Sequence, residues 1–394
     1  MFPERIARIA DALKDEGVDA WLFFDFHNRE PIAYSVLGLP MKFCSRRWFY
    51  VVRADGTTMK VVSAVEAGKI DELPGDRIVY RSWGDLEAGL KQALGDVKTV
   101  AMQYSPQGAI PYVSTVDAGT VELVRGLGYQ VVTSADLIQL FDAVLDEEHY
   151  QDHLKAAKNC YEVKDLAFAM IHDALRQGRA LSEWDVAEFI LREFDRRDMT
   201  MDDEVPIVGV DGHPADPHFE PTPENALPIV PGSKVLIDLW ARFKRADAIY
   251  GDITWCGFAG KTPPEEYKRI FEIVVKARDA GVAFIRQRLD AGKEVAGYEV
   301  DDRVREVVAR HGYGDYFVHR TGHSIHHEVH GNGANIDNLE TRDSRRLMDG
   351  LCFSIEPGIY LPDHMAVRTE IDVCIRQGKA IVSGPLQKEL ITLG

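Results

Sequence analysis

The sequence predicts an α/β protein with two domains, a small α/β domain at residues 1–143 and a larger α+β domain at residues 144–394. The first observation is length, since 394 residues exceed one average domain. The second is the alternation of short apolar strands with amphipathic helices in the first third of the chain. The third is a long, charge-rich helical region followed by apolar strands that contain acidic residues.

The first domain shows helix and strand signals in turn. The sequence first predicts an amphipathic helix, then a buried strand (AWLFF) and a hairpin of RWFYVV and TMKVV joined at Asp55 and Gly56. Strands RIVY and VKTVAMQY follow with a helix between them, and YQVVTS is the last strand. Asp25, His27 and Asn28 follow the first strand, where site residues often gather, but a polar loop is the preferred interpretation. We find no chemical motif in this domain.

The second domain is predicted to begin with two helices. A charge-rich helical stretch runs from Leu145 to about Arg176, and Gly178 is a typical stop signal. Ser182 and Asp185 have the spacing of a capping box, which predicts the start of the second helix.

Composition excludes several classes of function. The chain carries 46 basic and 63 acidic residues, a net charge of −17, so a general nucleic-acid binder is not expected. We expect neither a membrane span nor a signal peptide, because apolar runs of the required length are missing. The five cysteines form no CxxC pair, which favours reduced thiols in a cytoplasmic protein: Cys44, Cys160, Cys256, Cys352 and Cys374.

Acidic residues lie inside apolar strands of the second domain. Asp238 interrupts SKVLIDLW and Glu356 interrupts LCFSIEPGIYL. A buried carboxylate needs a partner, and for either residue alone a salt bridge or a capping role is as good an explanation as a site. Arg368, Glu370 and Asp372 alternate along VRTEIDV and therefore share one strand face. The interval from Glu356 to Glu370 suits neighbouring strands of an antiparallel pair.

Histidines gather in HGYGDYFVHRTGHSIHHEVH, which predicts a loop and then a strand. The motif HExxH does not occur in it, so the helical metalloprotease site is excluded. Carboxylates with one or two imidazoles suit Mn, Co, Zn or Fe, and four or more acids favour two cations over one. Six of the 13 histidines lie here: His311, His319, His323, His326, His327 and His330.

These motifs give the second domain a specific resemblance. The blocks VLIDLW…GDIT, HRTGHSIHHEVH, SIEPGIYL and VRTEIDV occur in the order seen in the pita-bread metallopeptidases, which include prolidase, aminopeptidase P and methionine aminopeptidase. The first domain resembles the creatinase-type N-terminal domain. The resemblance implies a curved, mostly antiparallel sheet in the catalytic domain and hydrolysis of Xaa-Pro bonds in short peptides by a metal-bridging hydroxide. It also implies two divalent cations, with Mn²⁺ expected and Co²⁺ or Zn²⁺ as alternatives, and a homodimer is expected.

The resemblance assigns roles to individual residues. It implies that Glu356 relays the proton of the attacking water, that His330 contacts the scissile carbonyl, and that His218 faces the substrate. His319 and Arg368 are expected to contact the substrate. Arg368 is also expected to hold Glu370 in position. The implied metal ligands are Asp238, Asp252, His323, Glu356 and Glu370.

The chain departs from the family pattern in ways that leave alternatives open. The interval between Asp238 and Asp252 is long, so Asp247 is a rival ligand, although Asp252 opens the DIT triplet. Unusual residues near the motifs are expected to alter substrate choice: Trp255, His326, His327 and Gly331. An Xaa-Pro aminopeptidase, a metal-dependent lyase, a creatinase-like hydrolase and an inactive binding module remain the alternatives to an Xaa-Pro dipeptidase.

Overall fold

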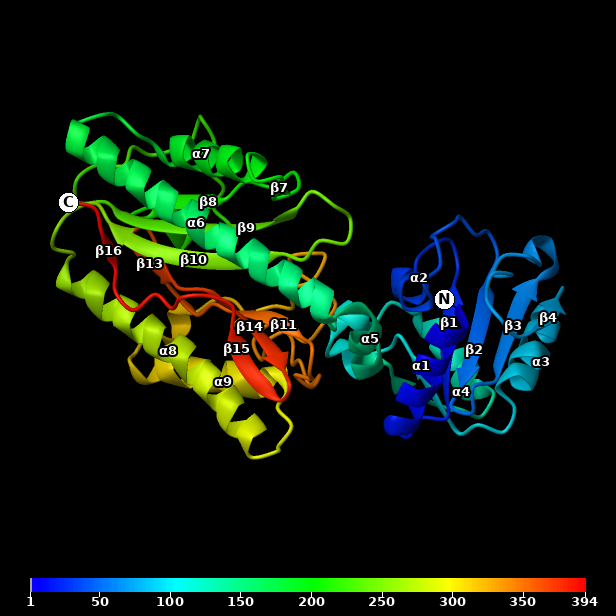
Figure 1. Ribbon diagram of the computed structural model, residues 1–394. Helices are drawn as coiled ribbons and strands as arrows, with labels where there is room; N and C mark the ends of the chain where they lie inside the picture. Colours follow the sequence, from blue (N-terminus) through cyan, green and yellow to red (C-terminus); the bar gives the residue numbers. More distant parts are fainter. Residues whose placement is uncertain (1) are drawn as a thin grey trace. The chain divides into compact units, whose positions relative to one another are not determined.

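The computed structural model describes residues 2–394, and the chain divides into two compact units, residues 1–142 and 143–394 (Figure 1). Each unit has its own buried apolar core. No helix within residues 2–394 combines the length and apolar character needed to cross a bilayer.

The first unit is a six-stranded mixed sheet in the order β4-β3-β2-β1-β5-β6. The predicted hairpin is confirmed, because β2 and β3 pair antiparallel across the turn at Asp55 and Gly56. The strands are β1 (Ala20–Asp25), β2 (Trp48–Arg53), β3 (Thr58–Ser63), β4 (Asp76–Tyr80), β5 (Thr99–Met102) and β6 (Gln130–Thr133). The helices are α1 (Phe2–Asp15), α2 (Pro31–Leu37), α3 (Trp83–Leu94), α4 (Ala118–Gly126) and α5 (Ala135–Asp142).

Asp25, at the end of β1, organises the loop that follows it. Its buried carboxylate accepts hydrogen bonds from the backbone N–H groups of Asn28, Arg29 and Glu30 and from the hydroxyl of Tyr34. These contacts give the backbone N–H groups of the loop their hydrogen-bond acceptors. They agree with the interpretation of this segment as a structural polar loop.

The second unit begins with the two predicted helices, both of which are confirmed. Helix α6 (Glu147–Gln177) ends at Gly178, which has the left-handed conformation that a C-terminal glycine tolerates. Helix α7 (Glu183–Asp195) begins with a capping box in which Ser182 and Asp185 bond each other's backbone N–H groups. Two further helices follow, α8 (Glu265–Asp290) and α9 (Gly297–Arg310).

The strands of the second unit are antiparallel, apart from the pairing of β10 with β16, in the part of the chain that the structure describes. The sheet β16-β10-β9-β7, with β8 beside β9, is accompanied by the sheet β11-β14-β15 and the hairpin β12-β13. The strands are β7 (Met199–Thr200), β8 (Ile207–Val210), β9 (Lys234–Phe243), β10 (Gly251–Phe258), β11 (Cys352–Ile355), β12 (Gly358–Leu361), β13 (Met365–Arg368), β14 (Ile371–Arg376), β15 (Lys379–Val382) and β16 (Ile391–Thr392).

Helices cover this strand layer from two sides. One apolar core joins α6 and α7 to β8, β9 and β10, and a second joins α8 and α9 to β11, β13 and β14 (Figure 1). The fold class predicted from the sequence, an α/β unit followed by a pita-bread unit, is confirmed. One local prediction is wrong. The histidine-rich segment forms no strand between residues 317 and 351, because its backbone pairs only through isolated bridges at Gly322 and Ser324.

Candidate metal centre

The long antiparallel pair β9–β10 places two aspartates on one strand face. Asp238 lies opposite Thr254, so Asp252, two residues before Thr254, is its diagonal neighbour on the same face. Both aspartates are buried, with exposed fractions of 6% and 3%. Trp255, on the alternate face, packs under the ammonium group of Lys164 in α6, 3.7 Å from the ring centre.

The long interval between the two aspartates is absorbed by the turn after β9. Asp247 lies in this turn with a side chain that is 68% exposed, and it forms an ion pair with Arg245. The turn therefore carries Asp247 into solvent, while the apolar strand carries Asp252 into the cluster of acids.

Glu356 and Glu370 face each other where two antiparallel segments meet. Ile355 pairs with Ile371 at the end of β11–β14, and Gly358 pairs with Arg368 at the start of β12–β13, so the same register sets Glu356 opposite Glu370. The backbone N–H of Glu370 donates to the carbonyl of Thr254, which attaches this point to β10.

His323 points at the carboxylates from the histidine-rich loop. Its Nε2 lies 3.4 Å from Glu356 Oε1, 3.6 Å from Asp252 Oδ2 and 3.9 Å from Glu370 Oε1. Its backbone N–H donates to Ser354 Oγ, and its carbonyl accepts from the N–H of Ser354. Gly322 permits this close pairing, because a Cβ there would lie 2.0 Å from the carbonyl oxygen of Ser354.

The negative charge of the buried carboxylates favours the binding of cations at the cluster. Burial, and then repulsion among the carboxylates, raises the pKa of Asp252 and of Glu370 well above its usual range. Oδ1 of Asp238 and Oδ1 of Asp252 have no hydrogen-bond partner among the described residues. One ligand atom each from Asp252, His323 and Glu370 lies within 4.8 Å of the others. Oxygen donors with one imidazole fit divalent cations of the Mn, Co or Zn type.

A hydrogen-bonded chain supports the acids from one side. Arg368 forms a buried ion pair with Asp238, and its Nε donates to Thr254 Oγ1 at 3.2 Å. The Thr254 hydroxyl donates in turn to Glu370 Oε2 at 2.7 Å. Arg368 also donates to the Tyr360 hydroxyl, which donates to His319 Nε2 at 2.7 Å, since His319 Nδ1–H is used by the carbonyl of Arg320.

The structure gives contacts with the site to three residues to which the sequence motifs assigned no role. Thr254 and Tyr360 connect Arg368 to its neighbours, and Asp372 Oδ2 accepts the backbone N–H of Asp252 at 3.0 Å. The DIT triplet and the alternation through Asp372 carried some signal for two of them. Tyr360 had none, because a tyrosine in an apolar strand usually indicates packing alone.

The remaining histidines divide into separate groups. The His330 ring lies 4.4 Å from that of His323, whereas His326 and His327 contact each other and His149 of α6. His311 is exposed at the end of α9 and takes no part in these ring contacts. The exposed His218 lies in the loop after β8, next to Pro217, whose carbonyl is 3.5 Å from Arg368 Nη1.

Comparison with known proteins decides the family. Residues 155–377, more than half of the chain, match metallopeptidase family M24. The chain belongs to this family. It is therefore a metallopeptidase hydrolase, and the match covers every residue of the acid and histidine cluster.

Individual M24 relatives resemble the chain over different lengths. An uncharacterised peptidase, YqhT, of Bacillus subtilis is 36% identical over 164 residues, which cover 41% of this chain and 42% of the relative. An Xaa-Pro dipeptidase of Lactobacillus helveticus is 29% identical over 57% of this chain and 59% of the relative. These alignments thus span about half of each relative. The crystal structure of dipeptidase PepE from Mycobacterium ulcerans matches 100% of this chain and 98% of its own, with a TM-score of 0.69 and 22% identity.

Proposed function

We propose that this metallopeptidase is an Xaa-Pro dipeptidase with two divalent cations at the cluster of acids. The observation that carries the proposal is the convergence of four buried carboxylates and one imidazole in which two aspartate oxygens lack any described partner. One divalent cation neutralises only part of that negative charge, so two fit better. The similarity to an Xaa-Pro dipeptidase supports the substrate class.

The residues of the cluster would have separate roles in catalysis. Asp238, Asp252, His323, Glu356 and Glu370 would hold the cations, which when bound activate water and polarise the peptide carbonyl. Glu356 is suited to receive the proton of the water, because it is the most exposed of the four carboxylates, at 9%, and burial raises its pKa to about 7.

Residues around the cluster would position the substrate. The exposed His330 and His218 would contact the peptide, and His330 would donate to the oxygen on which charge develops. Arg368 forms an ion pair with Asp238, and through its hydrogen bonds with Tyr360 and His319 it would support one side of the substrate site. Side-chain contacts of this kind suit proline, whose fixed φ and missing N–H prevent binding as an extended strand.

A substrate panel tests the proposal. The purified chain is stripped with a chelator, reloaded with Mn²⁺, Co²⁺ or Zn²⁺, and assayed on Xaa-Pro dipeptides, Xaa-Pro-Yaa tripeptides and matched peptides without proline. We expect metal-dependent release of proline from dipeptides. Cleavage of tripeptides instead would indicate an Xaa-Pro aminopeptidase, and activity that survives chelation would refute the metal mechanism.

Two aspartates of the β9–β10 hairpin provide a matched pair of variants. Asp252→Asn should lower both the metal content and the activity by at least tenfold, since it removes a buried carboxylate from the cluster. Asp247→Asn should leave both unchanged, because its side chain lies in solvent. The reverse ranking would mean that the cations bind elsewhere. A homodimer and a cytoplasmic location complete the proposal and are tested by sedimentation and by cell fractionation.

A further inference from the structure

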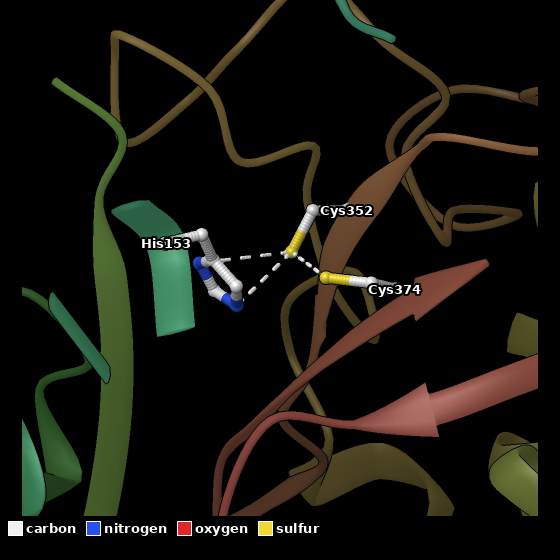
Figure 2. A group of neighbouring side chains, drawn as sticks. All are labelled: His153, Cys352 and Cys374. Atoms are coloured by element: carbon white, nitrogen blue, oxygen red, sulfur yellow. Dashed lines mark hydrogen bonds between the residues drawn. The ribbon is translucent and has the colours of Figure 1, made fainter. Parts of the chain in front are cut away.

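A second group of reactive side chains lies in the second unit apart from the cluster of acids. Cys352 of β11 and Cys374 of β14 face each other, and the imidazole of His153 in α6 lies beside them (Figure 2). All three side chains are buried, and the two sulfur atoms are 2.9 Å apart. Because His153 is some 200 positions from Cys352, only the fold brings this group together.

The strand register favours a covalent link between the two thiols. The backbone N–H of Ile375 donates to the carbonyl of Leu351, so the next pair, Cys352 and Cys374, occupies a position at which the two residues exchange no backbone hydrogen bonds with each other. At such positions the Cα atoms approach to about 4.5 Å, inside the range of about 4.4–6.8 Å that disulfides span. A small rotation of each side chain therefore suffices to join them.

Polar neighbours make one thiol a good nucleophile. Burial disfavours the charged form of His153, but Cys374 and Asp372 raise its pKa to about 9. The protonated ring therefore donates from Nδ1 to the carbonyl of Tyr250 and from Nε2 to Ser383 Oγ at 2.7 Å. Ser383 Oγ is 3.7 Å from the sulfur of Cys374. Burial opposes ionisation, but the hydrogen bond shared with Cys352 and the adjacent imidazole of His153 bring the pKa of Cys374 well below its usual range.

We propose that Cys352 and Cys374 form a reversible dithiol modification site that a hydroperoxide oxidises to a disulfide. The Cys374 thiolate attacks the peroxide oxygen, the O–O bond breaks, and a sulfenic acid and, after protonation, water are formed. The sulfur of Cys352 then attacks the sulfenic sulfur, which forms the S–S bond and releases a second water. Two thiols and one hydrogen peroxide thus give one disulfide and two waters.

A metal ion is the competing occupant, and two observations disfavour it. One ligand atom each from His153, Cys352 and Cys374 lies within 4.8 Å of the others, whereas a structural zinc site is closed by four ligands. With its pKa raised to about 9, His153 also holds a proton on the ring nitrogen that a metal ion would have to displace.

The disulfide would strengthen the strands that carry two carboxylates of the proposed metal centre. β11 leads directly into Glu356, and β14 follows directly after Glu370. A link from Cys352 to Cys374 would close the loop that contains both carboxylates and reduce the entropy of the unfolded chain. We expect the oxidised protein to unfold on the order of 5–10 °C higher than the reduced protein.

Peroxide treatment of the purified full-length chain tests this inference. After treatment, intact-mass analysis should show the loss of two hydrogens, alkylation should label two fewer thiols than in the reduced chain, and digestion should yield linked peptides containing Cys352 and Cys374. Dithiothreitol should reverse both changes and the thermal shift. Cys352→Ser and Cys374→Ser should each abolish the link, whereas Cys160→Ala, which alters a buried thiol with no second sulfur described beside it, should retain it.

Two results would overturn the inference. One is failure of the wild-type chain to form the linked peptide under peroxide, even in mild denaturant that opens the buried strands. The other is tightly bound zinc in the wild-type chain that disappears in Cys374→Ser but persists in Asp252→Asn. Loss of peptidase activity in the metal-site variants would leave this inference untouched, so its failure is separable from that of the proposed function.

Discussion

Thr254→Val offers a strict test of how the proposed metal centre is supported. The Thr254 hydroxyl is fully buried between two charged groups, accepting from Arg368 Nε at 3.2 Å and donating to Glu370 Oε2 at 2.7 Å. Valine has nearly the same shape, but its side chain can neither accept nor donate a hydrogen bond. The substitution therefore removes two hydrogen bonds without opening a cavity, and it leaves a buried carboxylate oxygen and a guanidinium N–H without that partner.

The expected magnitude follows from those contacts. A hydrogen bond to a charged group contributes about 1.5–3 kcal/mol, and a buried charged group that loses its partner costs at least as much. If Glu370 binds a cation only when it is held in this orientation, most of that energy appears as weaker metal binding. Because about 1.4 kcal/mol corresponds to a factor of ten, we expect Mn²⁺ to bind roughly 10–100-fold more weakly.

The chain supplies a matched control at the neighbouring threonine. Thr369 is also fully buried, and its hydroxyl has no hydrogen-bond partner among the described residues. Thr369→Val should therefore leave metal binding unchanged. Competition between protein and a chelating dye measures Mn²⁺ affinity for both variants, and the free Mn²⁺ needed for half-maximal peptidase activity provides a second readout.

The comparison can fail in two distinct ways. If Thr254→Val binds Mn²⁺ within about threefold of the wild type, the hydroxyl does not orient a ligand. If Thr369→Val weakens binding as much as Thr254→Val does, the effect comes from general disturbance of the strand, and the reasoning from hydrogen bonds is wrong.

Three further predictions concern stability. Burial raises the pKa of Glu30 to about 7 from the ordinary 4.5, so the stabilisation from protonated Glu30 is complete below about pH 4.5 and is lost as the pH rises through 7. Relative to Glu30→Gln, urea unfolding of the wild type should show a loss of about 3 kcal/mol between pH 4 and pH 8; parallel curves would contradict this. Tyr360→Phe deprives Arg368 and His319 of a buried partner and should lower the free energy of unfolding by about 1–3 kcal/mol, whereas the same change at the exposed Tyr316 should cost under about 0.5 kcal/mol. Chelation should lower the unfolding temperature of the second unit, and Mn²⁺ at 100 times its Kd should restore about 2.7 kcal/mol per site; an unchanged melting curve would speak against bound cations.

The sequence alone determined the local elements of this protein. The stop signal at Gly178 and the capping residue Ser182 correctly marked the helices of the second unit, because caps depend on contacts only a few residues apart. The hairpin turn at Asp55 and Gly56 was predictable for the same reason. Acids inside apolar runs also marked Asp238 and Glu356 as unusual, since burial of a charge is visible in the strand pattern itself.

Only the tertiary structure decided which of these residues meet. The DIT triplet favoured Asp252 over Asp247, but the burial of one and the exposure of the other depend on where the turn after β9 ends. The histidine-rich segment looked like a strand, but it forms only isolated bridges at Gly322 and Ser324. Local backbone bonds, such as that from the N–H of Gly331 to the carbonyl of Ser324, turn the segment into a loop that directs His323 toward the acids. The pairing of Cys352 with Cys374 needed the register of β11 and β14, and the approach of His153 needed the packing of α6. Neighbours along the chain set backbone conformation, whereas contacts between distant segments are set by the burial of whole strand faces, which no short stretch of sequence contains.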